Sequence, residues 1–154
     1  MTTTREADLP MPLLDADDLA DFIASRYRYA SKIVEVGVGF QFDTALALKR
    51  KRPELRLVVV DKNPESVEEA RRLGLEAYVD DVWNPDMNIY RGSSLIYSVR
   101  PPPELLEPIH RIAKAVGCSL LIRPLSGEYL SLPDETKWLR ITHGRARLLL
   151  YPQR

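Results

Sequence analysis

Short runs of aliphatic residues alternate along this chain with segments whose apolar positions recur at helical spacing. The aliphatic runs predict five strands, because buried parallel strands are continuous in apolar and β-branched residues. The predicted strands are 33–36, 55–60, 75–79, 94–98 and 119–123. Helical spacing marks the segments 15–27, 43–48, 63–73 and 105–116. Strands that alternate with helices build a mostly parallel sheet through right-handed crossovers.

The sequence also marks the ends of several helices. Asp15 or Asp17 can cap the first helix, since a side-chain oxygen at that position accepts hydrogen bonds from free backbone amides. The third helix has the fullest signals, with Asn63 as cap, Pro64 at the first helical position and Gly74 after its end. We therefore expect this helix to begin and end at these residues.

The last part of the chain has a different pattern. Two apolar segments, 138–142 and 145–151, flank His143–Gly144, which has the length of a two-residue hairpin loop with glycine supplying a positive φ. This pattern predicts an antiparallel pair. Together the segments predict an α/β fold of Rossmann-like type, doubly wound around a mostly parallel sheet, with a C-terminal antiparallel hairpin.

Length and composition indicate one globular domain over 1–154, with 1–12 expected as a flexible tail because it lacks the apolar core of a signal peptide. No apolar stretch approaches the roughly 20 residues that span a bilayer, so a membrane role is not expected. The 22 basic and 22 acidic side chains balance, and we interpret the basic clusters 49–52 and 145–147 as solvated surface, so nucleic acid is not indicated. A single cysteine, Cys118, fits a reducing cytoplasm.

The most informative segment is the first strand and the turn that follows it. Gly37 and Gly39 stand just beyond the carboxyl end of the strand, where glycine lets the backbone turn sharply and approach a ligand. The backbone amides of Gly37, Val38 and Gly39 can receive the charged tail of a cofactor. The alternative is a tight turn without a ligand, since two spaced glycines occur in many turns.

Acidic residues stand at the ends of the next two strands. Asp61 lies roughly twenty residues beyond the glycines, and its carboxylate can accept hydrogen bonds from both hydroxyls of a ribose. Asp80 or Asp81 can accept a hydrogen bond from an adenine amino group. Each acid alone is equally compatible with capping a turn. The order of strand, glycine turn, helix and acid nevertheless favours a nucleotide-type ligand.

Three further side chains near the glycine turn have open interpretations. Glu35 can accept hydrogen bonds from backbone amides or reach the ammonium group of a cofactor. Phe40 and Phe42 can stack on a ligand or pack the second helix onto the sheet, and we expect packing for one of them.

Ser98 and Arg100, at the end of the fourth strand, are candidates for the substrate side of a site, because a guanidinium suits a carboxylate or phosphate. Pro101–Pro103 either shape a loop at the mouth of the pocket or only begin the next helix. His110 and His143 are expected on the surface. The sequence therefore predicts neither a metal cluster nor a nucleophilic triad, and it identifies no catalytic residue.

These motifs together resemble known proteins. Ile33–Gly39, Asp61 and Asp80–Asp81 are similar to the first three motifs of class I S-adenosylmethionine-dependent methyltransferases. The combination of Glu-Val-Gly-Val-Gly, Val-Asp-Lys-Asn-Pro and Ser-Val-Arg-Pro-Pro-Pro-Glu-Leu resembles, over most of the chain, a small uncharacterised archaeal family with a methyltransferase-like Rossmann fold. The third glycine of the methyltransferase motif falls at Gln41, and that of the dinucleotide motif falls at Phe42.

The resemblance implies a fold of class I methyltransferase type that binds S-adenosylmethionine or S-adenosylhomocysteine, with methyl transfer to an unknown substrate. The residues implied to contact the cofactor are Glu35, Gly37, Val38, Gly39, Asp61, Asp80 and Asp81. A chain this short can complete its site through a homo-oligomer or a partner protein. The alternatives are a non-catalytic Rossmann-like binding or regulatory module and, less favoured because of Phe42, a protein that binds NAD.

Overall fold

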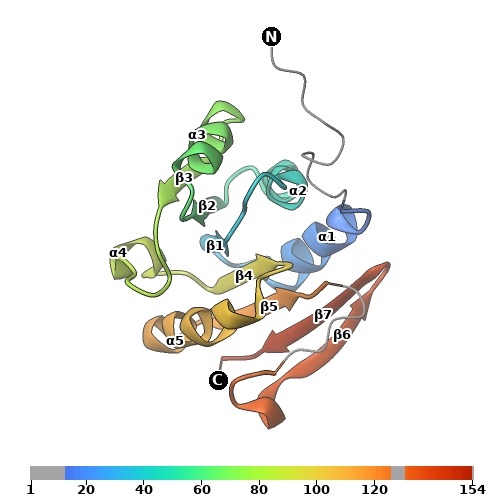
Figure 1. The fold of residues 1–154 in the computed structure, drawn as a ribbon. Coiled ribbons are helices and arrows are strands. Elements are labelled where there is room, and N and C mark those ends of the chain that lie inside the picture. The colour runs from blue at the N-terminus through green and yellow to red at the C-terminus, as the bar shows by residue number, and fades with distance from the viewer. Residues whose placement is uncertain (1–12, 126–130, 154) are drawn as a thin grey trace.

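The strand and helix segments form one seven-stranded sheet with helices on both faces (Figure 1). The structure is a computed structural model that describes residues 13–125 and 131–153. The strands are β1 (Lys32–Val36), β2 (Arg56–Asp61), β3 (Glu76–Val79), β4 (Leu95–Val99), β5 (Ser119–Arg123), β6 (Leu139–His143) and β7 (Ala146–Tyr151). The helices are α1 (Ala16–Arg26), α2 (Asp43–Lys51), α3 (Pro64–Arg72), α4 (Met87–Tyr90) and α5 (Leu106–Val116), with the 3₁₀ turns η2 (Pro103–Leu105) and η3 (Glu135–Lys137).

The order of the strands across the sheet is β3-β2-β1-β4-β5-β7-β6. β1 to β5 run parallel, whereas β7 pairs antiparallel with both β5 and β6. This is the predicted doubly wound sheet with its C-terminal hairpin. The order reverses between β1 and β4, and ligands of such sheets bind beyond the carboxyl ends of the strands at that point.

Alternating residues of β1 divide the core into two layers. Ile33 packs with residues of α1, α2 and α3, such as Leu48, on one face of the sheet. Val34 packs with residues of α4 and α5, such as Tyr90 and Ile109, on the other face. Because successive side chains of a strand point to opposite faces, Glu35 lies on the same side as Ile33. In the described residues no helix is long and apolar enough to cross a bilayer.

The signals at the ends of α3 are confirmed. The Asn63 side chain accepts a hydrogen bond from the amide of Glu65 at 3.0 Å, Pro64 opens the helix, and Gly74 follows with φ +87°. The short helix α4 was not predicted, because its four residues are too few to show helical spacing.

The C-terminal hairpin is attached to α1. His143 Nε2 lies 2.8 Å from Asp21 Oδ2, and the backbone amide of Arg145 donates to Asp18 Oδ2 at 2.9 Å. His143 pairs with Ala146 in the ladder, so the two-residue loop is Gly144–Arg145. The predicted loop His143–Gly144 was therefore one residue early, because the contacts with α1 keep His143 in the strand.

Replacing Gly144 with alanine is expected to lower the free energy of unfolding by about 2 kcal/mol. Its φ is +57°, and an added Cβ would lie 2.7 Å from the Asp18 side chain that accepts from Arg145. Gly92→Ala is the matched control, because Gly92 also has a positive φ, at +80°, but has open space around it. Denaturant unfolding measures the free energy of unfolding of both variants. The loss in Gly92→Ala reports the cost of a positive φ alone, and the additional loss in Gly144→Ala reports the cost of displacing the Asp18 side chain. Equal losses in the two variants would show that the contact with Asp18 contributes nothing.

His110 is buried, with 6% of its surface exposed, and its prediction as a surface residue was wrong. It lies edge-on against Tyr151, with ring centroids 4.5 Å apart, and beside Trp138 at 6.3 Å. Residues 131–138 cover this face of α5, and the Trp138 indole donates to Pro133 O at 2.7 Å. The residues that bury His110 come from a segment more than 20 positions later in the chain. The exposed neighbour Arg111, on which the prediction relied, therefore did not indicate that His110 is buried.

Candidate functional site

The glycine turn after β1 is closed by hydrogen bonds within the protein. Gly37 and Gly39 adopt φ values of +72° and +56°, as glycine allows without a Cβ clash. The amides of Gly37 and Val38 donate to Val60 O at 2.8 and 3.2 Å, and the amide of Gly39 donates to Asp61 Oδ2 at 2.7 Å. Each of these three amides thus has an acceptor in the protein, and the prediction that they receive the tail of a cofactor stays a prediction.

Asp61 connects the glycine turn to the start of α3. Besides the bond from Gly39, its Oδ1 accepts from the amide of Asn63 at 2.8 Å. Ser66 of α3 donates to the carbonyl of Gly39 and closes the same arrangement. Asp61 is half-buried at the carboxyl end of β2. Because each carboxylate oxygen can accept more than one hydrogen bond, the carboxylate holds the turn and still has acceptor capacity for hydroxyl groups.

Glu35 is a buried carboxyl group below the glycine turn, with 1% of its surface exposed. In the described residues neither of its carboxylate oxygens accepts a hydrogen bond of good geometry, so the interpretation in which backbone amides satisfy it is not observed. The hydroxyls of Tyr97, its partner in the β1–β4 register, and of Thr44, in the first turn of α2, are also buried there without a hydrogen bond of good geometry, although the Tyr97 hydroxyl lies close enough to Glu35 to act on its carboxyl group. Burial raises the pKa of Glu35 to about 8, the Tyr97 hydroxyl opposes this rise, and the charge of Asp61 adds to it.

The two aspartates after β3 organise the connection to α4. Asp80 accepts from the amide of Asp86 at 3.0 Å and from the hydroxyl of the buried Tyr90. Asp81 Oδ1 accepts from the amide of Trp83 at 3.0 Å. Both side chains are half-buried. Their predicted contact with an adenine stays a prediction, and the structure adds a role in shaping this loop.

At the end of β4 the two substrate-side candidates differ in character. Ser98 is buried, and its hydroxyl donates to Val36 O at 2.7 Å, which ties β4 to β1 below the glycine turn. Arg100 has a left-handed backbone with φ +51°, and its amide donates to Arg123 O at 2.7 Å. Burial lowers the pKa of Arg100, repulsion from Arg123 lowers it further, and Asp15 opposes both effects.

Asp15 and Arg123 form an ion pair that the sequence did not reveal. Arg123 Nη2 and Nε lie 2.7 and 2.9 Å from the two carboxylate oxygens of Asp15, and both side chains are largely buried. Asp15, one of the two predicted caps, stands at the N-cap position of α1, but its side chain makes no capping bond. An arginine at the end of a buried strand was the available signal, because a buried guanidinium needs a partner.

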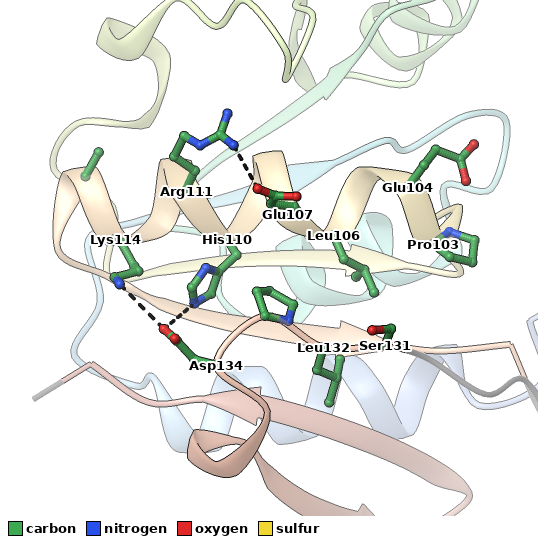
Figure 2. A pocket seen from close by; sticks show the side chains of 12 residues that line it. Pro103, Glu104, Leu106, Glu107, His110, Arg111, Lys114, Ser131, Leu132 and Asp134 are labelled. Carbon is green, nitrogen blue, oxygen red and sulfur yellow. Dashed lines mark hydrogen bonds and ion pairs between the residues drawn. The ribbon is translucent and has the colours of Figure 1, made fainter.

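A separate groove of about 870 Å³ runs along α5 and faces residues 131–134 (Figure 2). Its polar side chains are largely paired, with Asp134 Oδ2 lying 3.5 Å from both His110 Nε2 and Lys114 Nζ, and with Arg111 bound to Glu107 at 3.1 Å. None of the residues that line it is a predicted site residue. Across 13–125 and 131–153 no group of three histidine, cysteine, aspartate or glutamate side chains could hold a metal ion.

Comparison with known sequences gives one consistent family. A model of the uncharacterised protein family UPF0146 matches residues 16–150. A UPF0146 protein of Archaeoglobus fulgidus is 44% identical over 114 residues, which are 73% of this chain and 80% of that protein. A UPF0146 protein of Methanothermobacter thermautotrophicus is 36% identical over 135 residues, which are 88% of this chain and 93% of that protein.

Comparison with solved structures gives the fold. The S-adenosylmethionine-dependent methyltransferase SibL, in its apo form, matches with a TM-score of 0.64 at 16% identity, over 88% of this chain and 54% of SibL. This chain thus spans about half the length of SibL. The N-terminal domain of EvdMO1, solved with S-adenosylhomocysteine and D-fucose, matches with a TM-score of 0.60 at 16% identity, over 94% of this chain and 85% of that chain. The fold is the expected α/β fold of class I methyltransferase type.

Proposed function

This chain belongs to the uncharacterised protein family UPF0146, and from that premise we propose that it binds S-adenosylmethionine or S-adenosylhomocysteine at the carboxyl ends of β1, β2 and β3. The observation that carries the proposal is the bond from Gly39 to Asp61. It puts a half-buried carboxylate against the glycine turn, beside the point where the strand order reverses. Support also comes from structural neighbours of the same fold, such as the EvdMO1 domain, that were solved with S-adenosylhomocysteine.

The residues present suit the chemical groups of this cofactor. Asp61 retains acceptor capacity for the two ribose hydroxyls, and Asp80 is an acceptor for the adenine amino group. Glu35 is a buried carboxyl group whose oxygens accept no hydrogen bond of good geometry in the described residues, and a cationic ammonium is the counter-charge that its ionised form lacks. We assign the ammonium to Glu35 for this reason.

S-adenosylmethionine, when bound, supplies a methyl group on a positively charged sulfur. Its transfer to a nucleophile depends on alignment more than on an acid or a base. The chain's own contribution is then to hold the cofactor and to exclude water, and the proposal needs no catalytic pair. We propose a methyltransferase-like activity on these grounds, with an acceptor of unknown identity.

Asp61→Asn is expected to weaken binding of S-adenosylhomocysteine by about tenfold, because an amide offers one acceptor oxygen in place of two. Isothermal titration calorimetry of both cofactor forms against wild type and variant measures the effect. Asp17→Asn is the control, since Asp17 is exposed at the start of α1 and pairs only with Lys51 among the described residues. Thermal unfolding of the variants confirms that they are folded. Wild-type protein that gives neither heat nor a thermal shift with either ligand at millimolar concentration would overturn the proposal.

A non-catalytic binding module is the second candidate, and one observation favours it. The hydroxyl of Ser98 donates its hydrogen bond to Val36 O, and the neighbouring Arg100 is a cation. Neither side chain can therefore act as a base that takes a proton from a methyl-accepting substrate. Incubating the protein with cofactor that carries a labelled methyl group and with extracts of archaeal cells separates the candidates. Labelled product identifies a methyltransferase, and binding without product identifies the module.

NAD is a weaker candidate for the same position. Its pyrophosphate would need the amides of the glycine turn, and those of Gly37, Val38 and Gly39 already have acceptors. Phe42, at the position of the third glycine, is buried and packs between α2 and the sheet. Its ring fills space that the dinucleotide motif leaves open for close contact of helix and strand.

A further inference from the structure

The amino edge of the sheet, opposite the proposed cofactor site, collects basic side chains. Two segments lead into it, residues 26–32 between α1 and β1 and residues 49–56 between the end of α2 and β2. They contain eight of the 22 basic residues of the chain and only one of its 22 acidic residues, Glu54. The eight are Arg26, Arg28, Lys32, Lys49, Arg50, Lys51, Arg52 and Arg56. A chain without net charge therefore has a strongly positive edge.

Hydrogen bonds hold these two segments side by side. The Arg52 guanidinium donates to the carbonyls of Tyr27 and Ala30, at 2.9 and 2.8 Å. The amide of Arg56 donates to Ser31 O at 3.0 Å, where the parallel strands β1 and β2 begin. The basic cluster at the end of α2 was interpreted by itself as solvated surface. In the folded protein it continues into a second basic segment, which lies 22 to 25 positions earlier in the chain.

Five of the eight basic side chains have partners in the protein. Lys32, Lys49 and Arg52 donate to backbone carbonyls. Lys51 and Arg56 pair with carboxylates of neighbouring elements, at 3.2 and 2.8 Å. The fold therefore accounts for these five side chains.

The other three, Arg26, Arg28 and Arg50, are exposed and make no hydrogen bond or ion pair with the described residues. Arg26 and Arg50 lie in the last turns of α1 and α2, where a cation offsets the partial negative charge of a helix end. Arg28 lies beyond the end of α1, so the helix does not account for it.

Tyr29, the neighbour of Arg28, is the most exposed large hydrophobic side chain of the described residues, with 88% of its surface exposed. The Arg28 guanidinium lies over its ring, 4.9 Å from the centroid. An arginine on one face of an aromatic ring leaves the other face open to a second flat group. Nucleic-acid bases stack on exposed aromatic side chains in this way, and arginines beside them add cation–π attraction and contacts with phosphates.

We propose that the surface formed by Arg26, Arg28, Tyr29 and Arg50 binds a single-stranded segment of RNA. The guanidinium groups meet phosphates, and Tyr29 stacks on a base. Unpaired bases are needed because those of a duplex stack on one another, and RNA loops present such bases. The surface lies at the opposite edge from Asp61, so the proposal does not depend on the proposed function.

An anionic lipid surface is a less suitable partner for these cations. Helices and loops that bind at a membrane interface bury an apolar face in it. In the two basic segments Tyr29 is the only exposed large hydrophobic side chain. The segments therefore offer one aromatic ring among charges, which suits a strand of bases and phosphates.

The test is the fluorescence anisotropy of a labelled single-stranded RNA of about 12 nucleotides, titrated with the full chain at several salt concentrations. Tyr29→Ala is expected to weaken binding by about tenfold, and Tyr29→Phe, which keeps the ring, by less than about twofold. The triple variant Arg26→Gln/Arg28→Gln/Arg50→Gln is expected to weaken binding by at least about tenfold at low salt. It should also reduce the slope of log affinity against log salt by about 2, because three phosphate contacts are lost.

Two control variants match these changes. Trp83→Ala removes an exposed aromatic side chain from the loop after β3, and Arg111→Gln removes an exposed guanidinium that pairs with Glu107 on α5. Both should bind RNA as wild type does. Thermal unfolding checks that every variant is folded, which we expect because all the substituted side chains are exposed.

The proposal fails if wild-type protein does not bind the RNA at low salt, or if neither Tyr29→Ala nor the triple variant weakens binding. Duplex DNA, or vesicles of phosphatidylglycerol and phosphatidylcholine, bound more tightly than RNA and without dependence on Tyr29 would give the surface to that partner and overturn the proposal. Calorimetry with S-adenosylhomocysteine on the same protein tests the proposed function separately. Protein that binds RNA through this surface but no adenosyl ligand overturns only the proposed function, and the reverse result overturns only the RNA surface.

Discussion

Glu35→Gln is expected to raise the free energy of unfolding by about 3 kcal/mol above pH 8, because it removes a charge that the folded protein must bury. Most substitutions in a core have the opposite effect. The reason lies in the position of Glu35, which is buried on the α1–α2 face, where its oxygens accept no hydrogen bond of good geometry in the described residues and the Tyr97 hydroxyl only partly offsets the effect of burial. Glutamine has nearly the same shape and remains neutral at every pH.

The pH dependence gives the prediction its sign. Burial raises the pKa of Glu35 from 4.5 to about 8 in the folded protein. Between these values the folded protein keeps a proton that the unfolded chain has lost, so the contribution of Glu35 to stability falls as pH rises through this window. Below pH 4.5 both states are protonated, and above about 8 both are ionised. The advantage of Glu35→Gln should therefore grow from pH 5 to pH 8 and then level off.

Urea unfolding of both proteins at pH 5, 6.5, 8 and 9 measures this difference. Glu104→Gln serves as the control, because Glu104 is exposed in η2 and should show no comparable trend. Two parallel stability curves for wild type and Glu35→Gln would show that Glu35 ionises in the folded protein as it does in the unfolded chain. A bound ammonium should reverse the trend, because it favours the charged carboxylate.

Asp15→Asn is expected to lower the free energy of unfolding by about 3 kcal/mol, because it leaves the guanidinium of Arg123 without its buried counter-charge. The two Asp15–Arg123 bonds, at 2.7 and 2.9 Å, join the start of α1 to the end of β5. Burial by itself raises the pKa of Asp15, but the hydrogen bond and the charge of Arg123 outweigh it, so the pKa lies below 3.8. The loss caused by the variant should therefore shrink as the pH falls below about 4.

Two comparisons isolate the ion pair. Asp17→Asn removes a carboxylate two residues away that is exposed and pairs with Lys51 at 3.2 Å, and its cost should stay under about 0.5 kcal/mol. The double variant Asp15→Asn/Arg123→Gln should recover part of the loss, because no unpaired charge remains. A double variant that is as unstable as the sum of the two single variants would rule out a coupling between these side chains.

The features that were predicted well depend on residues close together in the sequence. The glycines after β1, the cap of α3 and the acid at the end of β2 each have a short-range pattern, and each lies where the pattern placed it. The expectation for Phe40 and Phe42 was also confirmed, since Phe42 is buried and Phe40 is 46% exposed. The mostly parallel sheet and its C-terminal hairpin followed from these elements and from the resemblance to a known fold, whereas the order of the strands came from the structure.

The features that could not be predicted depend on contacts between distant residues. Asp15 and Arg123 are 108 positions apart. Because the sequence already suggested a role for Asp15 as a helix cap, nothing pointed to an ion pair with Arg123. His110 was misplaced because residues 131–138 cover it. The acceptors of the Gly37 and Val38 amides belong to β2, so only the folded structure shows that these donors are occupied. Periodicity and spacing carry no information about such pairs.

The attachment of the hairpin to α1 also has a consequence for the order in which the chain can fold during synthesis. Asp18 and Asp21 bind partners that lie 127 and 122 positions later in the chain. A ribosome makes α1 early and the hairpin late, and β5 remains an open strand edge until β7 arrives. Until the hairpin is made, the nascent protein thus exposes both the unpaired edge of β5 and the side of α1 that the hairpin later contacts. We expect this stage of synthesis to be the most prone to aggregation and the one at which a chaperone protects the chain most.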